Sequence, residues 1–321
     1  MTGTVLVTGA GGFVGQRVVA ALAAAGVPVN AGYRRPPPGG TALNVLEPKA
    51  LAVAMPGIET VVHTAVGGAR DTRVIVDGTR NTLAAARAAG VKRFIQLSSV
   101  AVYGAATGTI DEDAPTDHPH GAYGAAKVAA EVACQQAGDA LVVAILRPTL
   151  IYGPRSAAWT TAYLDRLHDG WPVLGEAGRG DANLVHVDDL AGFITHLATS
   201  ATPITGTFNV NGADIPTWHT YLEALRDAVQ APAGTGALPG SATLTARKLA
   251  KAASAAASRA GVSLGALERF VARTPSHDEV ARFRTPVRYT IERMLATGYA
   301  PRITVAEGIA DIAGWERAGR P

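Results

Sequence analysis

The sequence predicts an α/β protein with a doubly wound parallel sheet in its first half and a smaller α/β part towards its C-terminal end. Short β-branched runs alternate with longer Ala-rich stretches of helical period, which is the pattern of a parallel sheet wrapped by helices. Several of the short runs are almost continuously apolar, as in strands that are covered on both faces. A length of 321 residues allows about two domains.

The first half contains the strongest strand and helix signals. The expected strands are Thr4–Thr8, Pro28–Arg34, Thr60–Thr64, Arg93–Ser98 and Leu141–Arg147, with a weaker strand at Thr41–Val45. The expected helices are Gly12–Ala25, Pro48–Met55, Val74–Ala89 and Gly121–Gln136. Gly or Pro closes each helix, at Gly26, Pro56–Gly57, Gly90 and Gly138.

The pattern loosens after Pro154. The expected elements are a helix at Ala158–Asp169, a strand at Asn183–Val187, a helix at Asp189–Thr199, a strand at Thr207–Val210 and a helix at Trp218–Val229. We therefore expect one domain over residues 1–154 and a second part over residues 155–321, of which about 183–210 return to the first sheet. The Ala-rich segment Ala242–Ala260 is expected to be a solvated helix, because it lacks the bulky apolar face of a membrane-surface helix.

Composition excludes several classes of protein. The 29 Lys and Arg residues against 26 Asp and Glu residues give a net charge of +3 without a long block of one sign, which argues against nucleic-acid binding. No uncharged apolar run approaches about 18 residues, and the start of the sequence lacks the pattern of a signal peptide, so we expect neither membrane insertion nor export. The single cysteine, Cys134, cannot form an internal disulfide; we expect it to be a small buried side chain in a cytoplasmic protein.

A glycine-rich turn follows the first expected strand and opens the first helix. It reads Thr8-Gly9-Ala10-Gly11-Gly12-Phe13-Val14-Gly15. Without Cβ atoms the backbone can approach a pyrophosphate, which free N–H groups and the helix N-terminus then hold. This context predicts a Rossmann-type dinucleotide site, whereas the alternative is a tight turn that needs positive φ for steric reasons alone. The expected cofactor contacts here are Gly9, Gly12, Phe13, Val14 and Gly15.

The end of the second strand bears on the choice of cofactor. NAD-binding folds place a carboxylate about 20 residues beyond the glycines. This chain instead has Arg34 and Arg35, whose guanidinium groups would pair with a 2′-phosphate. We therefore expect NADP to be preferred and NAD to be possible, with Arg34 the first candidate and Arg35 the second. The alternative is that both arginines are merely solvated.

Two further segments carry groups suited to acid–base chemistry. Tyr123 and Lys127 lie four residues apart on an expected helix, so they share one face. A nearby cation stabilises a phenolate and lowers a phenol pKa from its usual value of about 10. Ser98 and Ser99 stand at the carboxyl end of the preceding strand, where ligands of open α/β sheets bind.

Together, these motifs resemble the extended short-chain dehydrogenase/reductases, which form the NAD(P)-dependent epimerase/dehydratase superfamily. The matching segments are the Thr-Gly-x-x-Gly-x-x-Gly turn, Leu97–Gly104 and Tyr123-Gly-Ala-Ala-Lys127, and the resemblance covers nearly the whole chain. It implies that Ser99, Tyr123 and Lys127 are catalytic: Ser99 stabilises the substrate oxygen, Tyr123 transfers the proton, and Lys127 holds the nicotinamide ribose. Ser98 is expected to be structural.

The resemblance implies further contacts. For the cofactor these are Asn44, Val45, Thr64, Ala65, Pro148 and Thr149, besides Tyr123 and Lys127. For the substrate they are Ser99, Tyr152 and Asn183, within a pocket formed between the sheet edge and a C-terminal substrate-binding part, with packing the expected role of Trp159. The segment His186–Leu190 matches a family signature that we interpret as structural, with Asp188 or Asp189 capping the next helix. Its ligand set is too sparse for zinc, so no metal is expected.

Two positions depart from the family pattern. Ile75 stands where many members have an Asn that assists a proton relay, which leaves the proton route to solvent open. Leu150 stands where many nucleotide-sugar enzymes have Asn, which disfavours a nucleotide-sugar substrate.

The expected function is an NAD(P)-dependent oxidoreductase that transfers a hydride between nicotinamide C4 and a carbonyl or secondary-alcohol carbon of a small molecule, of the 3β-hydroxysteroid or dihydroflavonol type. The alternatives are a nucleotide-sugar epimerase, dehydratase or reductase that recycles its cofactor, and a non-catalytic NADP-binding sensor. A homodimer is expected through the helices at Val74–Ala89 and Gly121–Gln136, the second of which has small residues at Ala125, Ala126, Ala129, Ala130 and Ala133. Packing of these residues within one chain is the alternative.

Overall fold

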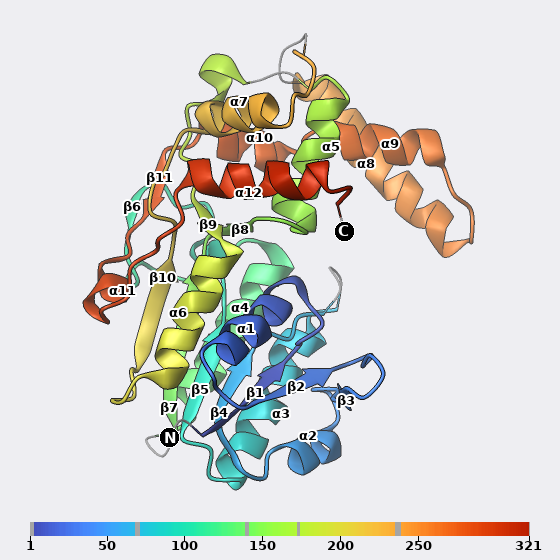
Figure 1. The fold of residues 1–321 in the computed structure, drawn as a ribbon. Helices are drawn as coiled ribbons and strands as arrows, with labels where there is room; N and C mark the ends of the chain where they lie inside the picture. Colours follow the sequence, from blue (N-terminus) through green and yellow to red (C-terminus); the bar gives the residue numbers. More distant parts are fainter. Residues whose placement is uncertain (1–2, 68–70, 139–140, 172–173, 235–238, 321) are drawn as a thin grey trace. The chain divides into compact units, whose positions relative to one another are not determined.

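The chain forms two compact units in a computed structural model that describes residues 3–67, 71–138, 141–171, 174–234 and 239–320 (Figure 1). The first unit comprises Met1–Ile151, Leu184–Ala213 and Tyr289–Ile303. The second comprises Tyr152–Asn183, Asp214–Arg288 and Thr304–Pro321. The segment Tyr289–Ile303 belongs to the first unit although it follows most of the second in sequence, and the sequence analysis did not foresee this.

A seven-stranded parallel sheet forms the centre of the first unit. Its strand order is β10-β7-β5-β4-β1-β2-β3. The strands are β1 (Thr4–Thr8), β2 (Val29–Tyr33), β3 (Thr41–Ala42), β4 (Ile58–His63), β5 (Arg93–Leu97), β7 (Val142–Pro148) and β10 (Gly206–Val210). From β1 the chain builds outward through β2 and β3, and from β4 it builds in the opposite direction. The predicted doubly wound parallel sheet is therefore confirmed, and its carboxyl ends meet along one edge.

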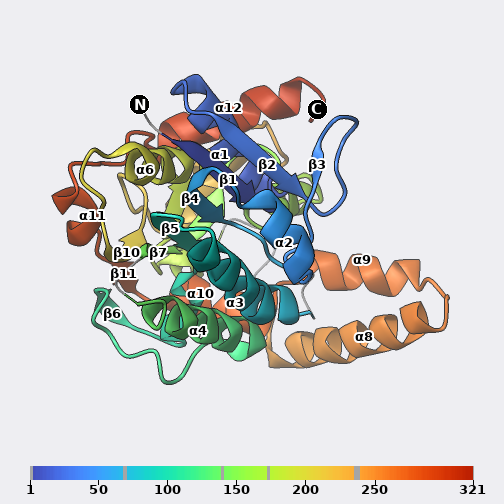
Figure 2. The same cartoon turned by 90° about the horizontal axis from the view of Figure 1, so that it is seen from below.

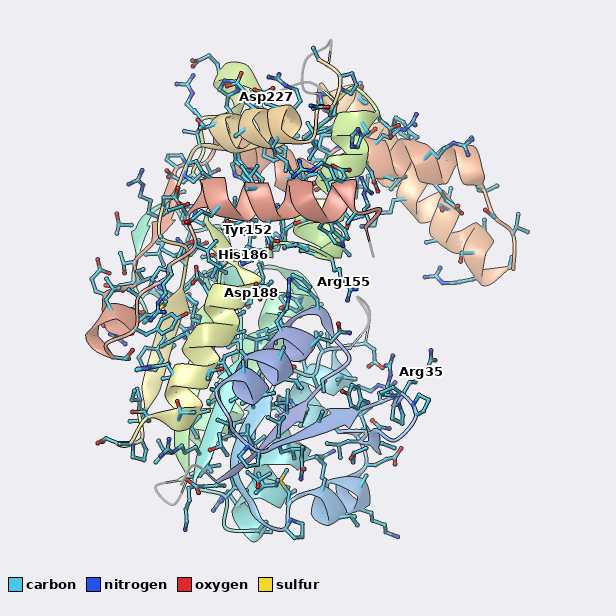
Figure 3. The ribbon with its side chains drawn as sticks, viewed as in Figure 1. Arg35, Tyr152, Arg155, His186, Asp188 and Asp227 are labelled. Atoms are coloured by element: carbon cyan, nitrogen blue, oxygen red, sulfur yellow. The ribbon has the colours of Figure 1, made fainter. Side chains whose placement is uncertain are left out.

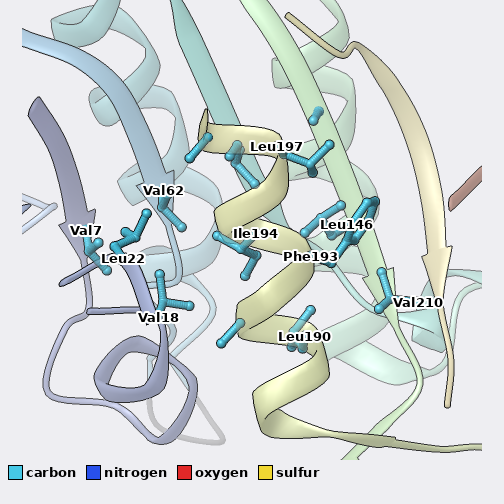
Figure 4. Packing of buried hydrophobic residues seen from close by; sticks show 14 of the residues in the cluster. Val7, Val18, Leu22, Val62, Leu146, Leu190, Phe193, Ile194, Leu197 and Val210 are labelled. Atoms are coloured by element: carbon cyan, nitrogen blue, oxygen red, sulfur yellow. The ribbon is translucent and has the colours of Figure 1, made fainter. Parts of the chain in front are cut away.

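Helices cover both faces of this sheet, as Figure 2 shows. One face carries α1 (Phe13–Ala24) and α6 (Val187–Thr199). Their side chains pack on those of the strands, for example Leu22 of α1 and Ile194 of α6 on Val62 of β4 (Figure 4). The other face carries α2 (Pro48–Ala54), α3 (Arg73–Ala88) and α4 (Gly121–Gln135). Each fully buried Leu or Phe contributes about 1.5–3 kcal/mol to folding, so this packing fixes the strand ends that carry the site.

The predicted ends of these helices and turns are confirmed by the backbone. Gly26, Gly57, Gly90 and Gly138 have φ angles of 71°, 77°, 72° and 81°. Only glycine adopts this left-handed conformation without a steric penalty, so it ends a helix at low cost.

The remaining elements near the sheet are shorter. They are the 3₁₀ turn η1 (Val100–Tyr103) and the elements β6 (Gly108–Ile110), β8 (Leu150–Tyr152), β9 (Leu184–His186) and α11 (Glu292–Ala296). The prediction that Asp188 or Asp189 caps α6 is wrong. The His186 side chain accepts a hydrogen bond from the Asp188 N–H at 3.3 Å, while the Asp189 carboxylate accepts from the backbone of Arg302 at 2.9 Å.

The second unit is mainly helical. Its elements are the π-helical turn η2 (Ala157–Thr161), α5 (Ala162–His168), η3 (Gly175–Gly178), α7 (Trp218–Ala228), α8 (Ser241–Arg259), α9 (Gly265–Arg273), α10 (His277–Arg284), β11 (Val287–Tyr289) and α12 (Val305–Arg317). Aromatic rings form its interior, with Trp218 centred 5.1 Å from Phe283 and 5.8 Å from Tyr163. Within the described part of the chain, no helix has the length and apolar character needed to cross a membrane.

Candidate active site

The three predicted catalytic residues come together at the carboxyl end of β5. Ser99 directly follows this strand, and its hydroxyl accepts a hydrogen bond from the Ala101 N–H at 3.2 Å. Tyr123 and Lys127 occupy successive turns of α4, with the Lys127 Nζ 5.7 Å from the centroid of the Tyr123 ring. The Ser99 side chain is close enough to the Tyr123 phenol to lower the pKa of that phenol. A hydroxyl, a phenol and an amine therefore share one small region of the sheet edge.

The Lys127 amine is held rigidly. Only 3% of the residue is exposed, and Nζ donates to the Leu97 carbonyl oxygen at 2.6 Å. Burial lowers the pKa of Lys127 to about 8, and the negative charge of Glu131 opposes that shift. At neutral pH the group is therefore still an ammonium ion, close to the point at which it loses its proton.

The Tyr123 side chain reaches the surface, with 44% of the residue exposed. Loss of hydration around its hydroxyl raises the pKa of Tyr123, and the nearby Ser99 side chain opposes this shift. The phenol is therefore protonated at neutral pH, and it can donate a proton to an oxygen that also contacts Ser99.

The glycine-rich turn fits a pyrophosphate. A Cβ at Gly9, which has a φ of 72°, would lie 2.8 Å from the Ala65 backbone, and a Cβ at Gly15 would lie 2.2 Å from the Gly9 carbonyl oxygen. Gly12 is the N-cap of α1, and no side chain caps this helix end. The amide groups of the first turn, which includes Phe13 and Val14, are thus left without a side-chain acceptor, as anion binding at a helix N-terminus requires.

Four other predicted cofactor residues lie at the carboxyl ends of the strands. Thr64 follows β4, and its hydroxyl donates to the Thr8 carbonyl oxygen at 2.8 Å. Ala65 is the residue that a Cβ at Gly9 would strike. Pro148 ends β7, and the buried hydroxyl of Thr149 donates to Asn211 at 3.0 Å. All four therefore lie on the sheet edge to which the glycine-rich turn and the predicted catalytic residues belong.

Asn44 and Val45 have local structural roles. The Asn44 side chain accepts from the Leu46 N–H at 3.1 Å and donates to Glu47 at 2.7 Å, which shapes the approach to α2. Val45 is 5% exposed and packs in the core beneath α2 and α3. Their contact with a cofactor stays a prediction.

Arg34 and Arg35 are exposed just after β2, and Figure 3 labels Arg35. Arg73, at the start of α3, donates to both carboxylate oxygens of Asp71 at 2.9 Å. These hydrogen bonds hold the pKa of Asp71 below its ordinary value, and Arg34 adds to the effect through its charge. Asp71 thus interacts with one arginine that follows β2 and with one at the start of α3.

The predicted substrate residues Tyr152 and Asn183 are buried inside the second unit. Tyr152 is 1% exposed and packs edge-on against Tyr221, with the ring centroids 6.1 Å apart. Asn183 is 4% exposed and donates to the Val287 carbonyl oxygen at 2.7 Å. These contacts make both side chains structural in the chain by itself, and their contact with a substrate stays a prediction. Trp159 stacks on Tyr163, which confirms its expected packing role.

A buried ionic network that was not predicted from the sequence lies on α4 and β7 beside the predicted catalytic residues. Arg147 Nη2 donates to a Glu131 carboxylate oxygen at 2.7 Å, and the Ser98 hydroxyl donates to the same carboxylate. Arg147 Nη1 also donates to the Tyr103 hydroxyl at 2.8 Å. The spacing of four residues between Lys127 and Glu131 is the sequence signal that would have indicated this network.

Comparison with known proteins identifies the family. The family model of the NAD dependent epimerase/dehydratase family matches residues 5–211. The chain belongs to this family. The glycine-rich turn, the seven-stranded sheet and the predicted catalytic residues all lie within or directly beside the matched range. The chain is therefore an enzyme of the extended short-chain dehydrogenase/reductase type that binds a nicotinamide cofactor.

Individual relatives differ in what they are named for. The chain is 33% identical, over 61% of its length, to N-acetyl-alpha-D-glucosaminyl-diphospho-ditrans,octacis-undecaprenol 4-epimerase of Escherichia coli O157:H7, of which the match spans 63%. It is 37% identical, over 47% of its length, to a 3 beta-hydroxysteroid dehydrogenase/Delta 5-->4-isomerase of Mycobacterium tuberculosis, of which the match spans 48%. Each match thus covers less than two thirds of that relative.

Solved structures of the same fold cover the chain almost completely. The structure of RMD from Pseudomonas aeruginosa complexed with NADPH superposes with a TM-score of 0.70 at 22% identity, covering 98% of this chain and 100% of that one. At this identity the likeness concerns the fold, and it agrees with the doubly wound α/β architecture predicted from the sequence.

Proposed function

We propose that this enzyme is an NADP-preferring oxidoreductase that interconverts a carbonyl and a secondary alcohol on a small molecule without a nucleotide. The observation that carries the proposal is the convergence of Ser99, Tyr123 and Lys127 at the end of β5, with the buried Lys127 amine 5.7 Å from the Tyr123 ring and bonded to the Leu97 carbonyl oxygen. A proton donor, a second oxygen ligand and a fixed cation are what carbonyl reduction requires of the protein.

The chain's residues divide the binding of the cofactor between them. The glycine-rich turn and the first turn of α1 would hold the pyrophosphate, and Arg34 followed by Arg35 would bind a 2′-phosphate. Thr64, Ala65, Pro148 and Thr149 would meet the nicotinamide half, together with the amine of Lys127. A bound nicotinamide supplies the hydride donor or acceptor of the reaction.

Proton transfer is the work of the side chains at the end of β5. In carbonyl reduction, Tyr123 donates its hydroxyl proton to the substrate oxygen as the oxygen gains negative charge. The Ser99 hydroxyl donates a hydrogen bond to the same oxygen and stabilises the developing alkoxide. The Lys127 ammonium then favours the phenolate that remains, because an adjacent positive charge stabilises it. In alcohol oxidation the same groups act in reverse.

Two features favour a substrate without a nucleotide. Leu150 places an apolar side chain where many nucleotide-sugar enzymes carry an amide, and the chain is similar to a hydroxysteroid dehydrogenase. The second candidate function is epimerisation with a recycled cofactor, which the similarity to a 4-epimerase of a lipid-linked sugar supports. The two functions differ in net chemistry, because an epimerase consumes no cofactor.

The test is a panel of carbonyl compounds followed at 340 nm with NADPH and with NADH, including 3-oxosteroids and nucleotide-linked 4-keto sugars. The proposal predicts net oxidation of NADPH, faster than that of NADH, with at least one carbonyl that lacks a nucleotide. Tightly held cofactor in the purified protein together with sugar epimerisation and no net oxidation would support the second candidate instead. A sensor would be favoured if the protein binds NADPH, turns over none of these compounds and keeps its biological function in Tyr123→Phe.

We also propose a cytoplasmic homodimer that forms through α3 and α4. Ala126 and Ala130 of α4 are buried against Ile75 of α3, so these small residues pack within the chain. Ala125 and Val132 of the same helix are exposed, Val132 by 43%, and they offer an apolar face for a second copy. By light scattering, we expect the wild type to be dimeric and the Val132→Glu variant to be monomeric. A monomeric wild type refutes the proposal.

A further inference from the structure

Glu131 is a buried carboxylate four residues beyond Lys127 on α4. The side chain of Glu131 is 4% exposed and that of its partner Arg147 is 6% exposed. Arg147 reaches the carboxylate with two nitrogens, Nε at 3.1 Å and Nη2 at 2.7 Å. This fork is the strongest geometry for an arginine and a carboxylate, and both charges would be costly to bury without each other.

The same carboxylate connects the two elements that carry the catalytic side chains. The Ser98 hydroxyl donates to Glu131, and Ser98 is the residue directly before Ser99 at the end of β5. Glu131 itself lies on α4, two turns beyond Tyr123 and one turn beyond Lys127. The hydrogen bond from Ser98 thus fixes the position of α4 relative to the end of β5. That position sets the distance from Ser99 to the side chains of Tyr123 and Lys127.

The partner of Glu131 is anchored on its other side. Arg147 Nη1 donates to the Tyr103 hydroxyl at 2.8 Å and to the Glu112 carbonyl oxygen at 3.0 Å. The Tyr103 hydroxyl donates in turn to Asn209 of β10 at 2.7 Å. Because every member of the network is tied to the sheet or to a neighbouring loop, the carboxylate has little freedom to move.

Glu131 also supplies a negative charge that acts on the Lys127 ammonium and raises the pKa of that group. The other two titratable groups that act on Lys127 are the Cys134 thiol on α4 and the His63 imidazole at the end of β4. Burial raises the pKa of Cys134 to about 12 and lowers the pKa of His63 to about 3, so both are neutral near pH 7. Arg147 is the ion-pair partner of Glu131, and its positive charge partly offsets that of the carboxylate.

We propose that Glu131 is a positioning residue for the reaction: its carboxylate sets Tyr123 and Lys127 against Ser99 and balances the buried charge of the Lys127 ammonium. The role in turnover rests on the proposed oxidoreductase function. The effect on Lys127 does not, because it concerns the chain without cofactor or substrate.

The test is Glu131→Gln, which keeps the size of the side chain and an oxygen that can accept from Ser98 but removes the charge. We expect kcat for carbonyl reduction to fall by about tenfold or more, since small misplacements of reacting groups have effects of this size. KM for NADPH should change less than about threefold, because the pyrophosphate site lies on other elements. The alkaline limit of the pH profile should move to lower pH, because less negative charge then supports the ammonium.

Two further variants separate positioning from stability. Glu131→Gln leaves the Arg147 charge unpaired, so the double variant Glu131→Gln/Arg147→Met removes both charges and should recover much of the lost Tm. Glu112→Gln is the matched control, since Glu112 is another buried carboxylate, but it bonds to the Asn209 N–H and faces Arg293 rather than Lys127. A stable double variant with wild-type kcat and pH profile overturns the inference, as does an equal shift of the pH limit in Glu112→Gln.

A titration of the cofactor-free chain provides a readout independent of turnover. In ¹³C NMR of labelled lysine, Lys127 should lose its proton at a lower pH in Glu131→Gln than in the wild type. An unchanged titration refutes the charge-balancing role of Glu131. Failure of the wild type to turn over any carbonyl would instead refute the proposed function, so the two failures are distinguishable.

Discussion

Substitution of Gly15 by alanine tests how much the tight backbone packing of the glycine-rich turn contributes to cofactor binding. A Cβ at this position would lie 2.2 Å from the Gly9 carbonyl oxygen and 2.9 Å from the Ala10 Cα. Both obstacles are backbone atoms, so relief requires the first turn of α1 to move by about 1 Å relative to the strand end. Overpacking of this kind costs about 1–3 kcal/mol. Since about 1.4 kcal/mol is tenfold in affinity, we expect the Kd of NADPH to rise about 10- to 100-fold.

Gly11→Ala is the matched control in the same turn. A Cβ at Gly11 would meet only the edge of the Tyr33 ring, at 3.3 Å, and no backbone atom within 4 Å. Calorimetry should therefore find NADPH affinity within about threefold of the wild type for Gly11→Ala, as for ordinary surface substitutions. Circular dichroism and Tm establish that both variants fold. Wild-type NADPH affinity in a folded Gly15→Ala protein would refute the assignment of this turn to the cofactor.

Three further predictions concern charge and buried hydrogen bonds. Arg34→Ala should raise the Kd of NADPH about 10- to 100-fold and leave that of NADH unchanged, because a charge-assisted hydrogen bond contributes about 1.5–3 kcal/mol. Equal weakening of NADPH and NADH binding in a fluorescence titration would contradict the 2′-phosphate role. Lys127, with a pKa of about 8, loses its positive charge as the pH rises through that value, so kcat/KM for carbonyl reduction should fall above it, and a profile that stays flat would contradict the assignment. Tyr221→Phe removes a hydroxyl without a hydrogen-bond partner in the described part of the chain and should leave Tm unchanged or higher. Tyr103→Phe instead removes hydrogen bonds with Arg147 and Asn209 and should reduce the free energy of unfolding by about 1–3 kcal/mol. The opposite order of stability in thermal unfolding would exclude these hydrogen bonds.

The sheet of the first unit could be predicted from the sequence because its signals are local. The strand Thr4–Thr8 has the predicted bounds, and β5 and β7 differ from the predicted strands by one residue at their ends. Strands covered on both faces are continuous apolar runs, and the glycines that end the helices are obligatory because of their positive φ.

The second unit could not be predicted in the same way. Its interior depends on contacts between residues far apart in sequence, such as the ring of Trp218 against that of Phe283. The helices α9, α10 and α12 all follow Ala260, and none of them was predicted from the sequence. Tyr152 and Asn183, the predicted substrate residues, are interior residues of this unit, and their contact with a substrate stays a prediction.

The candidate catalytic region contains features that the sequence predicts and features that it does not. The spacing of Tyr123 and Lys127 on one helix and the place of Ser99 after a strand are local patterns, and the structure brings all three side chains together. The pairing of Glu131 with Arg147 joins α4 to β7, the next element in the chain, and the spacing of Lys127 and Glu131 on the helix does not by itself reveal that both charges of this pair are buried.

The turnover of Tyr123→Phe tests the central claim most directly. This variant keeps the ring and removes the hydroxyl that is assigned to proton transfer. With the best carbonyl substrate and NADPH, kcat should fall by at least about 100-fold, the usual loss for a general acid, while the Kd of NADPH stays within about threefold of the wild type. A variant that binds NADPH and retains wild-type kcat would contradict the account.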